Sequence, residues 1–144
     1  MRITSLDFEN NTSIPLEFTG DGKNINPSIE ILEPPKNTQS FVLVIDDPDA
    51  NSWVHWLVFN ISPKITKINK NSVPGIQGKN SWNKNNYMGP TPPSGTHRYF
   101  FRVYALDIRL DLNEGVTIKQ VENAIRSHIL EESELIGLYT RRLI

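Results

Sequence analysis

The sequence contains no cysteine, and this absence excludes several kinds of site at once. Disulfide frameworks, thiolate zinc sites, iron–sulfur clusters and cysteine nucleophiles all need thiols. The chain also has no apolar run approaching the roughly 18 residues of a membrane span. Its start, MRITSLDFENN, lacks the apolar region of a secretory signal. We therefore expect no stable membrane insertion, a cytoplasmic location, and chemistry carried by His, Asp, Glu, Ser, Tyr and backbone groups.

Net charge is also nearly absent. Fifteen Lys and Arg against sixteen Asp and Glu leave a net charge of −1, so the whole molecule does not attract nucleic acid, and we expect no such partner. The charges are nevertheless uneven, because residues 1–49 carry nine carboxylates and three Lys or Arg. Residues 50–106 carry seven Lys or Arg and no carboxylate. An anion that meets this middle stretch would encounter little repulsion.

A length of 144 residues without repeats or a linker predicts one domain over residues 1–144. Three segments, 41–45, 53–61 and 98–106, are rich in β-branched and aromatic residues and predict strong strands. The segment 53–61 is apolar on both faces, which is typical of a central strand covered on each side.

Weaker strand signals lie near the start of the chain, at Phe8 and over residues 14–19 and 29–32. Residues 62–97 are crowded with Asn, Gly, Pro and Lys. Loops this long in compact domains tend to carry function or to be disordered, so this segment is a place to look for a site.

The helical signal comes late. Thr117 and Gln120 have capping-box spacing, and apolar residues then recur at steps of three and four, which predicts a helix through about residue 132. A second helical turn over residues 131–136 and a final strand over residues 138–144 complete the prediction. Strands first and a helix last indicate a β-rich α+β fold.

Two histidines stand near strand starts, His55 after the turn Asp47-Pro48-Asp49 and His97 after a loop of prolines and glycines. Strict alternation places His55 on one strand face with Leu57 and Phe59. If the two strands are neighbours, both imidazoles and the turn converge at one sheet edge. The alternative interpretation is a buried, hydrogen-bonded histidine, a capping turn and a proline-stiffened loop.

Four ordered motifs carry a family resemblance over nearly the whole chain. They are DDPDA (46–50), WVHWLVFNI (53–61), YMGPTPPSGTHRYFFRVYALD (87–107) and SHILEESELIGLYTR (127–141). The sequence resembles the phosphatidylethanolamine-binding or Raf-kinase-inhibitor-like family, in particular its short bacterial and archaeal branch. The resemblance implies a β-sandwich built on a large central sheet, a short C-terminal helical element and a small anion-binding pocket.

The resemblance also implies which residues bind the ligand, and we add Trp53 as an apolar wall beside the prolines. The predicted ligand-binding residues are Asp47, Asp49, Trp53, His55, Tyr87, Gly89, Pro92, Pro93, His97 and Tyr99. One departure is Asn51, where the family usually has proline, and it puts the rigidity of the turn in question.

Imidazoles, a phenol and glycine-loop N–H groups suit a phosphate, whereas a carboxylate orients a histidine or pairs with an ammonium group. We therefore predict a binding protein for a small anionic or zwitterionic phosphorylated ligand, tighter at pH 6 than at pH 8 and without a cofactor or metal. The resemblance adds inhibition or regulation of a serine protease or kinase. The alternative is an Asp/His-dependent hydrolase or metal-site enzyme that acts on a small phosphoester.

Overall fold

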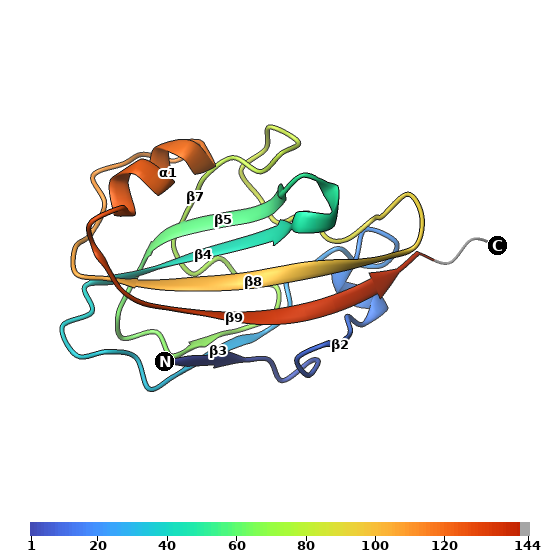
Figure 1. Ribbon diagram of the computed structural model, residues 1–144, viewed down its shortest axis with the longest axis horizontal. Helices are drawn as coiled ribbons and strands as arrows, with labels where there is room; N and C mark the ends of the chain where they lie inside the picture. The colour runs from blue at the N-terminus through green and yellow to red at the C-terminus, as the bar shows by residue number, and fades with distance from the viewer. Residues whose placement is uncertain (142–144) are drawn as a thin grey trace.

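The computed structural model describes residues 1–141 and contains two β-sheets and one α-helix within them (Figure 1). The six-stranded sheet has the order β2-β9-β8-β4-β5-β7 and the three-stranded sheet the order β1-β3-β6. The large sheet contains β2 (Thr12–Ser13), β4 (Ser40–Asp47), β5 (Trp53–Ile61), β7 (Ile76–Gln77), β8 (Thr96–Leu106) and β9 (Ile129–Thr140). The other elements are β1 (Arg2–Thr4), β3 (Ile29–Leu32), β6 (Lys67–Ile68), the 3-10 turns η1 (Leu16–Phe18) and η2 (Pro48–Ala50), and α1 (Ile118–Ile125).

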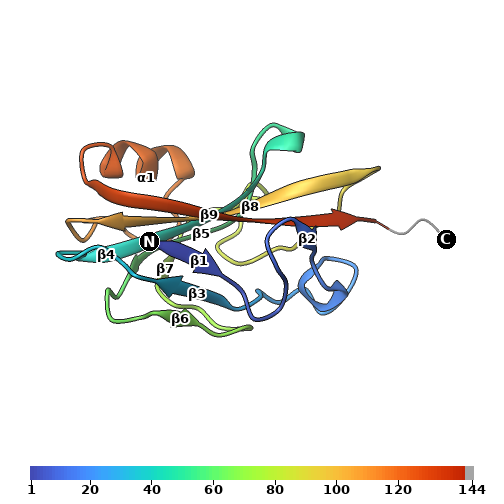
Figure 2. The same ribbon diagram turned by 60° about the horizontal axis from the view of Figure 1, so that its bottom comes forward.

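The large sheet forms the middle of the molecule, with the small sheet on one face and α1 on the other (Figure 2). This arrangement explains why β4 is buried on both faces. Phe41, Leu43 and Ile45 pack in the core that includes the small sheet, whereas Val42 and Val44 pack in the core beneath α1. The predicted β-rich α+β sandwich with a large central sheet and a short helix near the C-terminus is confirmed.

The strong strand signals were correct and the weak ones only partly so. β4, β5 and β8 contain the three predicted strong strands, and the prediction over residues 29–32 is confirmed as β3. The predictions at Phe8 and over residues 14–19 were wrong. Residues 14–19 contain η1, with a short strand, β2, just before them, because Pro15 begins a 3-10 turn instead of extending a ladder.

The helix begins as predicted but ends early. The Thr117 side chain accepts a hydrogen bond from the Gln120 N–H at 3.2 Å, and the Gln120 side chain accepts one from the Thr117 N–H at 2.9 Å. α1 ends at Ile125 instead of about residue 132, and the predicted helical turn over residues 131–136 is wrong.

Residues 129–140 form β9, which pairs antiparallel with the whole length of β8, from Thr96 opposite Thr140 to Leu106 opposite Ile129. The predicted final strand is therefore only the end of β9, and residues 142–144 of that prediction lie outside the described residues. Within residues 1–141, no helix is both long and apolar enough to cross a bilayer.

Candidate functional site

The order of the strands brings the predicted residues to one end of the large sheet. β4 lies between β5 and β8 and runs antiparallel to both. The end of β4, at Asp47, is therefore at the same edge as the starts of β5 and β8, which carry His55 and His97. The assumption that β5 and β8 are direct neighbours was wrong. The two histidines converge because each strand flanks β4.

A β-bulge turns His55 away from the face that alternation predicts. Ile45 pairs with Trp56 and Asp46 with Val54, so the register shift leaves His55 without a partner on β4. Leu57 and Phe59 pack beneath α1, whereas His55 lies against the Tyr99 ring on the opposite side of the sheet. Bulges commonly re-aim a side chain beside a functional site, and the predicted shared face was wrong for this reason.

A cavity of about 270 Å³ lies where these side chains meet. Seven predicted site residues line it: Asp47, Trp53, His55, Pro92, Pro93, His97 and Tyr99. Three further residues complete the lining: Ala50, Trp82 and Thr91. Of these, Trp82 is the residue that the sequence could have indicated, because a lone tryptophan in the polar loop NSWNKNN needs an apolar surface to contact.

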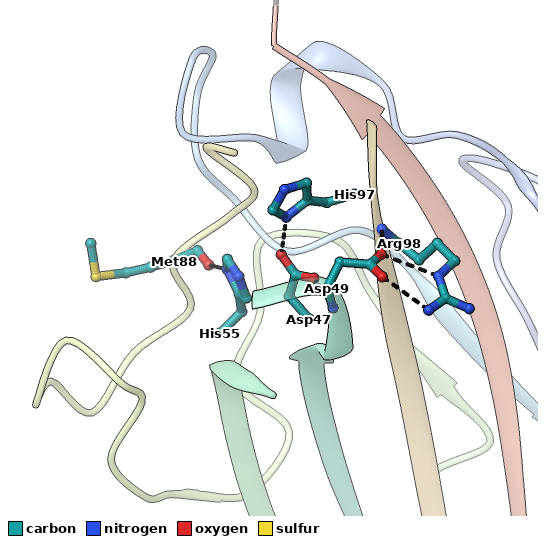
Figure 3. A network of polar contacts seen from close by, with 6 residues as sticks. All are labelled: Asp47, Asp49, His55, Met88, His97 and Arg98. Carbon is teal, nitrogen blue, oxygen red and sulfur yellow. Dashed lines mark hydrogen bonds and ion pairs between the residues drawn. The ribbon is translucent and has the colours of Figure 1, made fainter. Parts of the chain in front are cut away.

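Asp47 fixes the orientation of His97 (Figure 3). Its side chain is buried, and its Oδ2 accepts a hydrogen bond from His97 Nδ1 at 2.6 Å. Its Oδ1 accepts one from the Asp49 N–H at 2.9 Å, which caps η2. Because the carboxylate accepts, Nδ1 carries the proton, and Nε2 is the ring nitrogen of His97 that remains for a ligand.

His55 is held in the same way by the backbone. Its Nδ1 donates to the Met88 carbonyl oxygen at 2.7 Å, and its own carbonyl oxygen accepts from the Met88 N–H at 3.1 Å. Burial lowers the pKa of His55, against the opposing effects of the Met88 carbonyl and the Asp47 charge. His55 is therefore neutral at pH 7 when the cavity holds no anion, and its unprotonated Nε2 carries a lone pair that can only accept a hydrogen bond.

Tyr99 contributes a phenol to the lining. Burial, followed by the charges of Asp47 and Asp49, raises the pKa of Tyr99. The hydroxyl therefore keeps its proton at neutral pH and can donate a hydrogen bond. The Tyr99 ring also packs edge-on against His55, with ring centroids 5.2 Å apart.

Asp49 is a predicted site residue that does not line the cavity. Its carboxylate turns to Arg98 and accepts hydrogen bonds from the backbone N–H, Nε and Nη2 at 2.9, 3.1 and 3.0 Å. These bonds, the side-chain ones first, lower the pKa of Asp49. The residue ties η2 to the start of β8, and it supports the site without facing it.

Tyr87 and Gly89, also predicted, lie outside the lining and support the loop that carries Met88. The Tyr87 hydroxyl donates to the Phe18 carbonyl oxygen, and burial raises the pKa of Tyr87. The Gly89 N–H donates to Asn24 Oδ1 at 2.6 Å and is not free for a ligand.

The departure at Asn51 has a structural reason. Asn51 has φ 54° and ψ 42°, and Ser52 has φ 56°, so both residues that lead from η2 into β5 are left-handed. Proline fixes φ near −65° and cannot adopt this conformation, whereas asparagine tolerates it. The turn in this chain therefore requires a residue other than proline at position 51.

We expect Asn51→Pro to lower the free energy of unfolding by at least about 1–2 kcal/mol, because the left-handed backbone must rearrange. Asn51→Gly is the matched control and should stay within about 0.5 kcal/mol of the parent, because glycine adopts positive φ freely. Urea unfolding followed by circular dichroism measures both. Equal stability of the proline variant and the parent would contradict this account of the turn.

Fold and cavity together define a β-sandwich with a histidine-lined cavity at one end of its large sheet, and comparison with known proteins gives this class a name. A sequence profile described as "Phosphatidylethanolamine-binding protein" matches residues 4–140. A UPF0098 protein of Methanothermobacter thermautotrophicus is 43% identical, and the match covers 98% of this chain and 99% of that protein. The chain therefore belongs to the phosphatidylethanolamine-binding protein family.

Solved structures agree with this assignment. The crystal structure of CT736 from Chlamydia trachomatis, described as a homologue of phosphatidylethanolamine-binding protein, is 34% identical with a TM-score of 0.95, covering 98% of this chain and 97% of that one. Escherichia coli YbcL, described as a member of the mammalian family, has a TM-score of 0.90 at 23% identity, covers 98% of both chains, and shows the shared fold.

Proposed function

We propose that the cavity binds a small phosphorylated or otherwise anionic group, and that the protein acts by binding instead of by catalysis. The observation that supports this proposal best is that His55 and His97 line one cavity with both Nδ1 atoms already hydrogen-bonded. Each ring therefore has only Nε2 left for a ligand. Two such nitrogens on one cavity suit the several oxygens of a phosphate.

Which nitrogens of the two imidazole rings carry protons determines when the rings attract an anion. Each Nδ1 donates to an oxygen that only accepts, the Met88 carbonyl for His55 and the Asp47 carboxylate for His97. In a neutral ring, Nε2 is consequently an acceptor. Adding a proton turns Nε2 into a charged donor, so anion binding and imidazole protonation favour each other.

Asp47 does not prevent anion binding in this arrangement. Asp47 lines the cavity, but it is buried and its two oxygens already accept hydrogen bonds from His97 Nδ1 and from the Asp49 N–H, so two donors partly offset the negative charge of the carboxylate. The apolar walls formed by Trp53, Pro92 and Pro93 then strengthen each polar contact by excluding water.

We expect phosphate and sulfate to bind about tenfold more tightly at pH 6 than at pH 8. The pKa of His55 lies below its ordinary value in the free protein; a bound anion raises this pKa, so binding takes up protons and strengthens as the pH falls from 8 to 6. Titration calorimetry at both pH values measures the effect, and sulfate serves as the control because it keeps its charge over this range. Equal affinities at both pH values, or tighter sulfate binding at pH 8, would contradict the protonation argument.

The hydrolase alternative uses the same four residues, Asp47, Asp49, His55 and His97. Asp49 binds Arg98 and does not line the cavity, so it is not placed to act as an acid or base there. The Asp47 carboxylate already accepts hydrogen bonds from His97 and from the Asp49 N–H. In the part of the chain that the structure describes, no three His, Cys, Asp or Glu side chains are grouped so as to hold a metal ion. These observations favour a binding role.

Regulation of a serine protease or kinase is the second part of the proposal. Residues 63–95 would provide the contact surface, because this segment supplies Trp82, Pro92 and Pro93 to the cavity rim. A protein bound there would cover the anion site. We therefore propose that phosphate competes with such a target, which links the two parts of the function.

A further inference from the structure

A second cavity, the α1 groove, lies beside α1 on the face of the large sheet opposite the histidine-lined cavity (Figure 2). Its volume is about 500 Å³, and cavities of this size commonly hold small molecules. The two cavities approach the turn between β4 and β5 from opposite sides. Asp46 and Val54 line the α1 groove, whereas the adjacent Asp47 and His55 line the other cavity. A ligand in the α1 groove therefore contacts none of the residues on which the proposed function rests.

The floor of the α1 groove is aliphatic. The apolar lining consists of Val44, Val54, Ile118, Val121, Ile125 and Ile129. The residues that β4 and β5 contribute are buried, whereas Ile129, at the start of β9, is 39% exposed. Covering such a surface with an apolar group is favourable because it removes hydrocarbon from water. The α1 groove can therefore hold the apolar body of a ligand.

The rim of the α1 groove is acidic. A smaller hollow continues it across β8 and β9, and Tyr104 lines both. Four carboxylates and two guanidinium groups line the groove and the hollow, which leaves a net charge of −2. These groups are Asp46, Glu122, Glu132 and Glu134 on the acidic side and Arg102 and Arg126 on the basic side.

The two arginines are already engaged by polar partners. Arg102 lies between two carboxylates, with its Nε 2.9 Å from Asp46 Oδ2 and its Nη1 3.1 Å from Glu134 Oε2. Arg126 Nη2 donates to Asn123 Oδ1 at 2.9 Å. Within residues 1–141, Glu122 forms no ion pair. Negative charge therefore remains unmatched at the rim, and it attracts a cation and repels an anion.

Two hydroxyl groups add neutral oxygen atoms to this lining. Tyr104 and Ser52 both line the α1 groove, and neither hydroxyl forms a hydrogen bond within the described residues. Burial raises the pKa of Tyr104, and the charges of Glu132, Asp46 and Glu122 act in the same direction against that of Arg102. A protonated primary amine has three N–H donors, and carboxylate and hydroxyl oxygens can accept all three.

An aliphatic floor beside an acidic rim suits a molecule with an apolar body and one protonated amine. We propose that the α1 groove is a second ligand site, which binds a small amphiphilic amine. The apolar chain lies against Val121 and Ile125, and the ammonium group donates hydrogen bonds to the Glu122 carboxylate and the Tyr104 hydroxyl oxygen. This site is independent of the histidine-lined cavity.

NMR titration of the ¹⁵N-labelled protein with octylammonium, octanol and octanoate, each below the concentration at which it aggregates, tests the inference. We expect octylammonium to bind at least about fivefold more tightly than octanol, and octanoate to bind most weakly. Butylammonium should bind at least about tenfold more weakly than octylammonium, because fewer methylene groups are buried. The amide shifts should change along α1 and at Val54 and Tyr104.

Glu122→Gln keeps the shape of the side chain and removes its charge. This variant should lower the preference for octylammonium over octanol at least about twofold. Glu114→Gln is the matched control, because Glu114 is exposed and does not line the α1 groove. It should leave the preference unchanged. If the two variants show the same preference, the role given to Glu122 is wrong and the inference is overturned.

The three eight-carbon probes also distinguish this site from its alternatives. Equal binding of all three would indicate an apolar groove without charge selection, and tighter binding of octanoate would indicate an anion site at the arginines; either result overturns the inference. The variant His55→Asn/His97→Asn should bind octylammonium as tightly as the parent does. If that variant loses binding, the probe occupies the histidine-lined cavity, and the inference fails while the proposed function is untouched.

Discussion

Replacing His55 and His97 together by asparagine is expected to weaken phosphate binding at pH 6 by at least about 100-fold, because two charge-assisted hydrogen bonds are lost. Asparagine is the sharpest choice, since its amide N–H occupies roughly the position of the histidine Nδ1–H. His55→Asn can therefore still donate to the Met88 carbonyl, and His97→Asn to Asp47. The substitutions therefore remove only the Nε2 contact of each ring, and titration calorimetry measures the loss of phosphate affinity.

The third histidine provides the matched control. His128 lies outside the cavity, partly exposed, with its Nδ1 2.8 Å from Asp107 Oδ1. His128→Asn makes the same chemical change away from the cavity and should leave phosphate affinity within about twofold of the parent. Phosphate binding by the double variant that is as tight as binding by this control would refute the role given to the two imidazoles.

Gly89→Ala is expected to lower the free energy of unfolding by at least about 2 kcal/mol, although it adds only one methyl group. A Cβ at this position would lie 2.3 Å from the Phe18 carbonyl oxygen and 2.9 Å from Thr19 Cα. Both atoms belong to the backbone, so no side-chain rotation relieves the contact. Chemical denaturation measures the change in stability.

The same substitution should also weaken phosphate binding, because Gly89 follows Met88, whose carbonyl oxygen orients His55. Gly95→Asn is the control: its surroundings are open, its φ is +69°, and asparagine tolerates that conformation. It should change stability by no more than about 0.5 kcal/mol. If the Gly89→Ala variant were as stable as the Gly95→Asn control, the loop would accommodate a side chain at position 89 and the prediction would be wrong.

Local sequence signals were sufficient for the strands that form the core. β4 and β5 are apolar on both faces because a layer covers each face of the large sheet, and that pattern is visible in the residues themselves. β9 was misread because Glu131, Glu132 and Glu134 favour helix in isolation. Its strand form depends on pairing along the whole of β8, a long-range contact that periodicity does not report.

The candidate site was only partly predicted, again because its geometry depends on contacts between distant parts of the chain. Short motifs identified seven of the cavity residues, including Asp47, His55 and His97. The intervening position of β4 and the bulge at His55 are properties of register, which neighbouring residues in the sequence do not specify. Asp49 binds Arg98, which lies 49 positions further along the chain, so no local pattern showed that Asp49 turns away from the cavity.

A crystal structure of the protein soaked with inorganic phosphate at pH 6 tests the central claim most directly. The account predicts one phosphate in the cavity, with separate oxygens within hydrogen-bond distance of His55 Nε2 and His97 Nε2, and with the Nδ1 bonds to Met88 and Asp47 unchanged. An empty cavity at saturating phosphate, or a phosphate that contacts neither imidazole, would contradict it.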